Sequence, residues 1–461
     1  MGGGASCVGG YVPRGGVATA LHGAVREGLA ELVEETDKLG GLPGFIVKEL
    51  HAYLRCGDLA YGFVRVRCAE CDEELRVGFS CKGRTVCPSC AGRRAAVTAA
   101  HLVDEVLPGV PFRQWTLAFP RALRLVLAMD GRLLSAALGA FVGAIFALQR
   151  RHARRLGVGE PRPGAVAFLQ NFTSALLLHP HFHVLVADGV FEVAGSDFVA
   201  LPPVTDEEVE RLLRRVARRV WKQARARYPD GLPYAEDARV ALAAASAQTR
   251  LPLGEEGTPV KRRRCAFLEG FSLHADTWVH ANDRQSLERL CRYGARGPLA
   301  LERLTRREDG RLEYRLKKPS HGGATTLVLT PVQLLKRVCA LVVKPRLHLT
   351  RYFGVFAPHA SARAQVVPSG KEPAEPATTP EQLSLDGDLR VPTRARPRLD
   401  WAQLLRRTWG FDVFDCPCGG RRRVLALVRS PAIARKILGL PLRDAVPPRS
   451  TGPPQLSLAL T

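Results

Sequence analysis

Three histidines stand at alternate positions inside one apolar run, Leu178-His179-Pro180-His181-Phe182-His183-Val184-Leu185-Val186. The apolar and β-branched residues around them predict a β-strand, and side chains two apart on a strand share a face. The three imidazoles therefore line up on one face, where they can bind a divalent metal ion. The alternative is a solvated polar face on an edge strand. Three histidines in register inside an apolar strand favour the metal site.

The segments around this strand predict how it is packed. Residues 165–171 form a second strand that can pair antiparallel with it through a turn at Thr173-Ser174. Residues 123–156 are helical, with a break around Met129-Asp130-Gly131. Thr205-Asp206-Glu207-Glu208 is a capping box that opens a helix with one apolar face, which we expect to cover a sheet. We predict an α/β (α+β) protein built on a mainly antiparallel sheet with packed helices.

Cysteine spacing predicts a zinc module. Cys68-x2-Cys71 is followed, after fifteen residues, by Cys87-x2-Cys90, which is the spacing of a four-cysteine zinc site. Cys81 lies inside the loop and is either a fifth candidate ligand or a core residue, whereas Cys56 lies outside the spacing. The C-terminal Cys416-Pro417-Cys418 is a weak metal signal, because no second cysteine pair follows it.

Charge predicts the partner. The chain has 67 Lys and Arg against 44 Asp and Glu, a net charge of +23, which favours nucleic acid as the partner and an anionic membrane second. The longest apolar stretch, residues 136–148, is too short to span a membrane, because a membrane-spanning helix needs roughly 20 residues. No secretory signal is visible, so we expect a cytoplasmic protein with free or metal-bound thiols and no membrane partner.

Composition also predicts the domain organisation. We expect a Gly-rich segment and helix at residues 1–45, a zinc module at 46–100 and a catalytic domain at 101–367. A linker rich in Pro, Thr, Glu and Arg follows at 368–399, and a small C-terminal unit at 400–461. The oligomeric state is left open.

A metal on His181 and His183 can polarise a phosphodiester, and the nucleophile is then either water or a tyrosine. Tyr293 lies in Arg289-Leu290-Cys291-Arg292-Tyr293-Gly294-Ala295-Arg296, where Arg292 and Arg296 can neutralise a phosphate. The alternative for Tyr293 is an ordinary half-buried tyrosine. Two further cations, Arg262 and Arg263, belong to a basic run at residues 261–264 and are expected to contact DNA.

Together these motifs resemble a known family. The His-Phe-His strand looks like the motif of HUH single-strand endonucleases. The cysteine module, "LLHPHFHVLVADGVF" and "LCRYGARGPLALERL" resemble, in this order, the zinc-containing rolling-circle transposases of insertion sequences, closest to the common-region (ISCR) type. The resemblance implies an HUH-type sheet preceded by the zinc module, and single-stranded DNA at transposon ends and target DNA as partners.

The resemblance also implies a role for each matching residue. Tyr293 would form a 5′-phosphotyrosine and free a 3′-OH. His181 and His183 would bind Mg²⁺ or Mn²⁺, with Gln170 of the preceding strand as a third ligand, and His179 would be dispensable. Structural Zn²⁺ would be held by the module's cysteines: Cys68, Cys71, Cys87 and Cys90.

The chain departs from the family in two places. Some relatives have a second tyrosine four residues earlier, where this chain has Arg289, so it resembles a single-tyrosine enzyme. Relatives tend to have a C-terminal C-x2-C pair, where this chain has Cys416-Pro417-Cys418. Three alternatives stay open: a metal-dependent nuclease that uses water, a zinc-dependent DNA-binding regulator without chemistry, and an inactive transposase copy.

Overall fold

The structure is a computed structural model that describes residues 19–192, 197–232, 241–242, 263–319, 323–368, 403, 406–407 and 412–441. These residues fall into two compact units. The larger unit takes them from Gly15–Cys56 and Ser80–Val413, and the smaller from Gly57–Phe79 and from Phe414 onward. The predicted zinc module at 46–100 is thus shared between two units. The predicted Gly-rich start and all but the first residue of the predicted linker lie outside the described residues.

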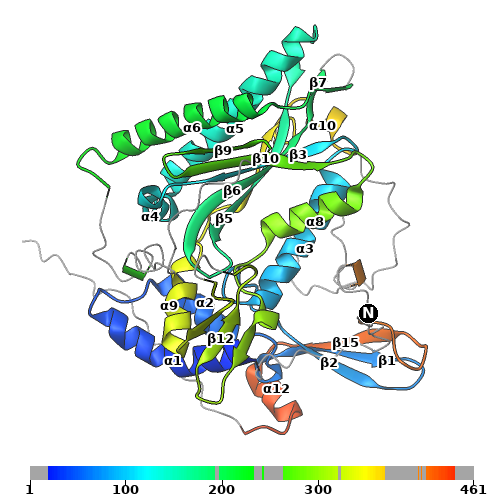
Figure 1. Cartoon of the computed structure of the whole chain (residues 1–461). Helices are drawn as coiled ribbons and strands as arrows, with labels where there is room; N and C mark the ends of the chain where they lie inside the picture. The colour runs from blue at the N-terminus through cyan, green and yellow to red at the C-terminus, as the bar shows by residue number, and fades with distance from the viewer. Residues whose placement is uncertain are drawn as a thin grey trace, which may run out of the picture. The chain divides into compact units, whose positions relative to one another are not determined.

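Six antiparallel strands form the main sheet of the larger unit (Figure 1), in the order β14-β5-β6-β3-β10-β9. Their bounds are β3 Phe112–Ala118, β5 Gly164–Phe172, β6 Leu178–Ala187, β9 Cys265–Leu268, β10 Phe271–Val279 and β14 Thr350–Gly354. The predicted hairpin is confirmed as β5–β6, in which Gln170 lies opposite His181. The mainly antiparallel α/β fold is confirmed with it.

Helices cover both faces of this sheet, because successive side chains of β6 alternate between two cores. Phe182 and Val184 pack in a core with α4 (Arg121–Met129), α5 (Gly131–Arg155) and α6 (Asp206–Arg227). Leu185 points the other way, into a core with α3 (Pro88–Glu105) and α8 (Arg284–Ala295). His181 and His183 have the same parity as Leu185, so they lie on the α3 and α8 face.

Local signals predicted several helix boundaries correctly. α4 ends at Met129, and the Asp130 side chain caps α5 by accepting from the backbone N–H groups of Arg132 and Leu133. The capping box at Thr205 and Glu208 is present and opens α6. Within the described residues, α5 is the one helix long and apolar enough to cross a membrane, but most of it is buried in the protein.

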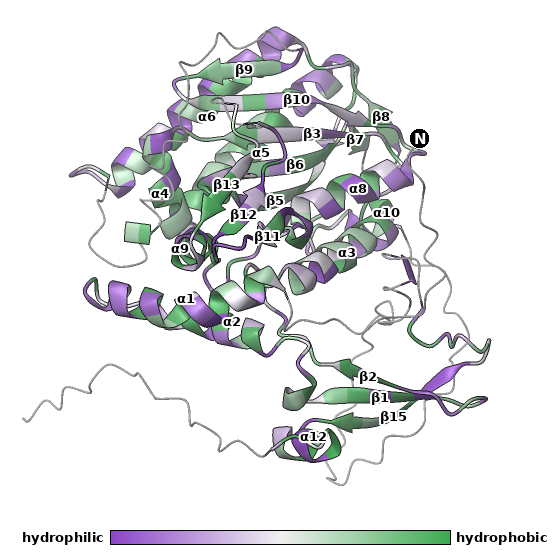
Figure 2. Cartoon of the chain, turned by 60° about the horizontal axis from the view of Figure 1, so that its bottom comes forward, coloured by the Kyte–Doolittle hydropathy of each residue, from purple (hydrophilic) through white to green (hydrophobic). Residues whose placement is uncertain are grey.

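The rest of the larger unit forms a second core and two small sheets. The second core brings α1 (Ala20–Asp37), α2 (Gly44–Leu54) and α9 (Pro331–Leu341) onto the sheet β11-β12-β13. Its strands are Leu304–Arg306, Leu312–Arg315 and Thr326–Leu329. The other sheet, β4-β7-β8, comprises Pro161–Arg162, Gly189–Glu192 and Phe198–Ala200. The mixed hydropathy of α1, α2 and α3 in Figure 2 is that of amphipathic helices with one buried face. A short helix, α10, spans Arg363–Val366.

The smaller unit is a three-stranded antiparallel sheet in the order β15-β1-β2. It comprises β1 (Phe63–Cys68), β2 (Glu74–Gly78) and β15 (Arg422–Val428), flanked by a short 3-10 helix (Leu59–Tyr61) and α12 (Pro431–Ile437). Its small core holds Phe63, Val428 and Ala434. The middle strand therefore pairs with segments from both ends of the chain.

Candidate active site and metal centres

The three histidines of β6 form a row that ends beside the predicted nucleophile. The ring centroids of His179 and His181 are 5.4 Å apart, and those of His181 and His183 are 4.9 Å apart. The Tyr293 ring lies edge-on to His183, at 5.6 Å between centroids. The structure thus brings together two residues that are far apart in the sequence, because α8 packs on the histidine face of the sheet.

Hydrogen bonds fix how the histidines present their nitrogens. The Nδ1 of His181 lies 2.8 Å from the carbonyl oxygen of His179, and since a carbonyl only accepts, Nδ1 carries the proton and Nε2 keeps its lone pair. The Nδ1 of His183 lies 3.2 Å from the hydroxyl of Thr116 on β3. Burial lowers the pKa of His181, and lowers that of His183 to about 3, so both rings are neutral, which is the form that binds metal.

Two buried atoms at this site have no hydrogen-bond partner among the described residues: Nε2 of His183 and Oε1 of Gln170. The Nε2 of Gln170 donates instead to the carbonyl oxygens of Tyr293 (2.8 Å) and Gly294 (2.9 Å). A buried polar atom without a partner costs about 1–3 kcal/mol unless something else binds it. One imidazole nitrogen and one amide oxygen left free in this way suit a divalent cation.

A glycine allows α8 to approach the sheet so closely. A Cβ placed at Gly294 would lie 2.6 Å from the ring of Phe168 on β5, closer than packed carbon atoms come. Gly294 therefore permits the last turn of α8 to pack on β5, which holds the preceding Tyr293 next to His183. Sequence reasoning did not single out Gly294, although a glycine near a helix end is a common sign of close packing.

Two cations lie near the ring of Tyr293, a residue that is 37% exposed. The guanidinium of Arg296 lies 4.7 Å from the centroid of the Tyr293 ring and 5.0 Å from that of Phe172. The Nζ of Lys317 lies 5.2 Å from the same tyrosine ring. The exposed tyrosine therefore has two positive charges close to its ring, and these attract an anionic substrate.

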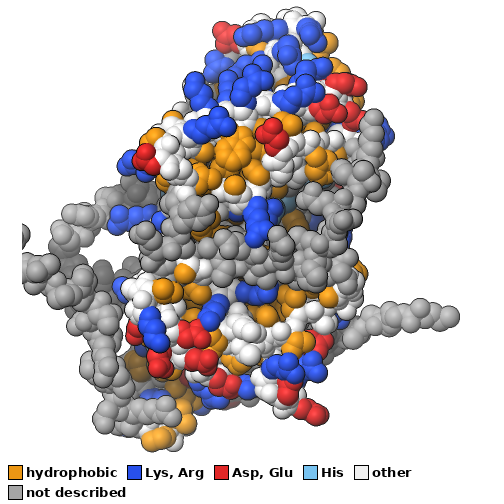
Figure 3. All heavy atoms as spheres, turned by 60° about the vertical axis from the view of Figure 1, so that its left-hand side comes forward, with side chains coloured by type: hydrophobic (Ala, Val, Ile, Leu, Met, Phe, Trp, Pro, Cys, Tyr) orange, Lys and Arg blue, Asp and Glu red, His pale blue; other side chains and the backbone are white. Residues whose placement is uncertain are grey.

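Other predicted DNA contacts lie elsewhere or cannot be placed. Arg292 is half-buried on α8, Arg263 is exposed, and Arg262 lies outside the described residues. A larger basic surface lies on the helices behind the sheet. Figure 3 shows Lys and Arg side chains gathered over the upper part of the molecule, where Figure 1 places α5 and α6. The exposed cations of these helices include Arg150, Arg151, Arg154, Arg155, Arg211, Arg214, Arg215, Arg218, Arg219 and Lys222.

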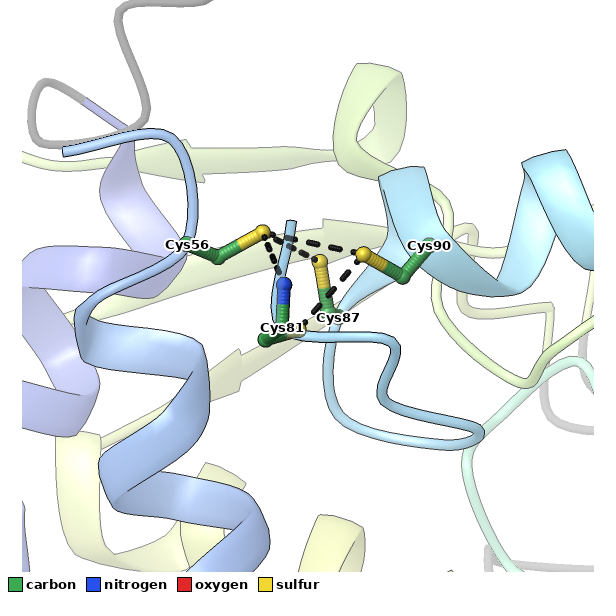
Figure 4. A group of neighbouring side chains, drawn as sticks. All are labelled: Cys56, Cys81, Cys87 and Cys90. Atoms are coloured by element: carbon green, nitrogen blue, oxygen red, sulfur yellow. Dashed lines mark hydrogen bonds between the residues drawn. The ribbon is translucent and has the colours of Figure 1, made fainter. Parts of the chain in front are cut away.

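Four thiols of the larger unit point toward one another (Figure 4): Cys56, Cys81, Cys87 and Cys90. All four Sγ atoms lie within 4.8 Å of one another. The hydrogen-bonded pairs of Sγ atoms are 3.5–3.6 Å apart. Four thiolates at about 2.3 Å from a tetrahedral zinc ion would be about 3.8 Å apart, so this cluster has the size of a zinc site.

Local structure places these four thiols. Cys56 follows α2, and Cys87 and Cys90 lie at the N-terminus of α3, where the helix dipole favours thiolate. The loop between Cys81 and Cys87 is held by Glu49, one of whose carboxylate oxygens accepts from three consecutive backbone N–H groups, residues 84–86, at 2.7–3.0 Å. Hydrogen bonding to Cys81 and Cys87 lowers the pKa of Cys56 to about 7.

This grouping corrects the predicted ligand set. Cys87 and Cys90 belong with Cys56 and Cys81, whereas Cys68 and Cys71 belong with Cys416 and Cys418 in the smaller unit. The prediction assumed that two C-x2-C pairs close in sequence serve one ion. It failed because Cys68 and Cys71 lie on the β1–β2 hairpin, which pairs with β15 and belongs to a separate unit.

The larger unit thus brings a histidine pair and an exposed tyrosine together on an antiparallel sheet, in a basic chain with a four-cysteine cluster. Residues 29–119 match the family model "Transposase zinc-binding domain", and residues 164–364 match the model "Putative transposase". The chain is also similar to "Putative transposase y4qJ" of Sinorhizobium fredii, with 25% identity over 314 residues. The aligned region covers 65% of this chain and 71% of that protein. No solved structure matches. These matches support a transposase of an insertion sequence with a structural zinc site.

Proposed function

We propose that the protein is a DNA transposase that nicks single-stranded DNA with Tyr293 as nucleophile and transfers the strand, as in rolling-circle transposition. The observation that carries this proposal is the position of the exposed Tyr293 ring, whose centroid lies 5.6 Å from that of His183 and within 5.2 Å of the cationic groups of Arg296 and Lys317. Its substrates would be single-stranded DNA at the element's ends and target DNA, and the matched transposase models support DNA as the partner. The protein acts in the cytoplasm, where this DNA is.

The reaction balances without a further reactant. The phenolic oxygen of Tyr293 forms a bond to phosphorus, and the bond from phosphorus to the 3′ oxygen breaks. The phenol's proton leaves and the 3′ oxygen gains one, so the products are a 5′-phosphotyrosine and a free 3′-OH. The phosphodiester energy is kept in the adduct, so a second 3′-OH can reverse the reaction and join the strands.

The side chains around Tyr293 hold the substrate and the nucleophile. Arg296 and Lys317 attract the scissile phosphate, and Gln170 holds the backbone of Tyr293 in place. His181, His183 and Gln170 would hold Mg²⁺ or Mn²⁺. Two of the ligand atoms, Nε2 of His183 and Oε1 of Gln170, have no partner among the described residues. When bound, the cation stabilises negative charge on the phosphate. The basic surface of α5 and α6 supports DNA binding that weakens steeply with salt.

End-labelled DNA tests this proposal. Single-stranded oligonucleotides covering both flanks of the gene are incubated with the protein and Mn²⁺ and resolved on a denaturing protein gel. We expect a 3′ label to migrate with the protein and a 5′ label to leave on a fragment that a polymerase can extend. Tyr293→Phe should lower adduct formation by at least about 10³-fold, and the control Tyr352→Phe should not.

The other outcomes identify the alternatives. Cleavage without a protein adduct, equal in wild type and Tyr293→Phe, would show a nuclease that uses water. DNA binding that survives loss of His181 and His183, with no cleavage of any flanking strand by the wild type, would show a regulator or an inactive copy.

A further inference from the structure

The smaller unit contains a second group of four thiols, Cys68, Cys71, Cys416 and Cys418. Their Sγ atoms lie within 4.8 Å of one another, with 3.6 Å between Cys68 and Cys418 and between Cys71 and Cys416. A disulfide needs about 2.05 Å, whereas tetrahedral zinc thiolates are about 3.8 Å apart. The spacing is therefore that of a metal site and not that of two disulfides.

Two tight turns present these thiols. Cys68 and Cys71 lie on the turn between β1 and β2, closed by a bond from the N–H of Cys68 to the carbonyl of Glu73. Cys416 and Cys418 lie on a turn before β15, closed by a hydrogen bond from the N–H of Cys416 to the carbonyl of Gly420 and by one from the N–H of Gly419 to the carbonyl of Cys416. The N–H of Gly420 also lies 3.4 Å from the sulfur of Cys418, a contact that steadies a thiolate.

Close contacts lock the two turns together. A Cβ at Gly420 would lie 2.1 Å from a carboxylate oxygen at the end of the exposed Glu70 side chain and 3.0 Å from the sulfur of Cys68, so any side chain there would displace Glu70 and press on Cys68. The buried guanidinium of Arg422 donates to the carbonyl of Asp415 (2.6 Å) and to Glu73 (2.7 Å). Segments 345 residues apart in the chain are thus held in register around the four sulfurs.

We propose that Cys68, Cys71, Cys416 and Cys418 bind a second zinc ion, so that each chain holds two. The matched zinc-binding domain ends at residue 119, so half of this ligand set lies outside it. The C-x-C pair can supply two ligands to one ion because its turn reverses direction at Gly419, which has φ +87°. Without a metal ion, the carboxylates of Glu70 and Glu73 accept hydrogen bonds from thiols of the cluster. Once zinc binds the thiolates, Glu70 still accepts from the N–H of Arg421 and Glu73 from the guanidinium of Arg422.

Zinc content of the full-length protein tests the proposal independently of any nicking activity. We expect two zinc ions per chain in the wild type by mass spectrometry. Cys418→Ser should remove one, and Cys71→Ser combined with Cys418→Ser should remove no more than one. Cys56→Ser combined with Cys418→Ser should remove both, whereas Cys339→Ser should keep both. Cys418 is exposed, so its loss leaves the core intact.

Gly420→Ala separates the site's shape from its ligands. It keeps all four thiols but places a methyl group against Glu70 and Cys68, so it should weaken the second zinc at least tenfold in chelator competition. Cobalt substitution should give tetrahedral thiolate bands for two ions in the wild type and for one in Cys418→Ser. One zinc per wild-type chain, unchanged by Cys418→Ser, would overturn the proposal.

Discussion

The side-chain amide of Gln170 donates a hydrogen bond to the carbonyl oxygen of Tyr293, at 2.8 Å. One end of this side chain thus holds the backbone of the proposed nucleophile, while the other end, Oε1, lies buried without a partner among the described residues. The proposed metal site and the proposed nucleophile are therefore joined through a single residue. Substitutions that separate the two ends of Gln170 can test this coupling.

Gln170→Glu should keep an oxygen ligand and lose both N–H donors. The carbonyls of Tyr293 and Gly294 would then face a carboxylate, so we expect a loss of about 1–3 kcal/mol of stability without metal. Added Mn²⁺ should raise the Tm of this variant more than that of the wild type, because the carboxylate adds charge to the ligand set. Thermal unfolding with and without Mn²⁺ measures both effects. If Mn²⁺ raised the Tm of Gln170→Leu by as much as it raises the Tm of the wild type, Gln170 would not be a ligand.

Gly294→Ala should reduce strand cleavage about 10–100-fold without altering any reacting group. The added methyl group meets the Phe168 ring, which displaces the end of α8 and with it Tyr293. The matched control is Gly143→Ala on α5, where a Cβ meets nothing within 4 Å and helix propensity should make the fold slightly more stable. Single-turnover cleavage rates of the two variants decide, and equal rates would contradict the proposed packing role.

Asp130 gives the larger unit a pH-dependent stabilisation. Burial raises its pKa, but hydrogen bonds from Arg227 and from the first backbone N–H groups of α5 outweigh this and hold it at about 2. Since folding lowers this pKa from 3.8, the charged carboxyl stabilises the fold above about pH 4, and the contribution is lost as pH falls toward 2.

Asp130→Asn should therefore lower the free energy of unfolding at pH 7 by about 1–2 kcal/mol, allowing for the exposure of Arg227. The difference from wild type should shrink to about a third of its pH 7 value at pH 2.5 and vanish only below pH 2, as urea unfolding at several pH values would show. The exposed Asp230→Asn is the control and should change stability by less than about 0.5 kcal/mol. A difference that is constant with pH would show that capping geometry alone matters.

Cys81→Ser should cost one zinc per chain and lower the Tm, although Cys81 lies outside both C-x2-C pairs. Its sulfur lies 3.5 Å from that of Cys90, and its loss leaves three ligands. Cys339→Ser changes another buried thiol outside both clusters and should keep the zinc content. Metal analysis after dialysis measures this. An unchanged zinc content in Cys81→Ser would show that the remaining three thiols hold the ion without Cys81.

Local patterns predicted the parts of this fold that local interactions determine. The alternation of residues 178–186, the break at Asp130 and the capping box at Thr205 each depend on neighbours a few residues away. The cysteine grouping depends on which strand pairs with β1, and that strand is β15, beyond residue 420. No spacing rule within one segment contains this information. Thr116 was missed for the same reason, since it meets His183 only through strand pairing.

The pairing of Phe63 with Val428 also sets the order in which the protein can be completed. These residues are 365 positions apart (428 − 63), which a ribosome working at 5–20 residues per second covers in roughly 20–70 s. Through that time the β1–β2 hairpin has an open edge, and an isolated two-stranded hairpin is marginally stable in water. The smaller unit is therefore the last to form during synthesis, and a chain that stops before β15 leaves it unfinished.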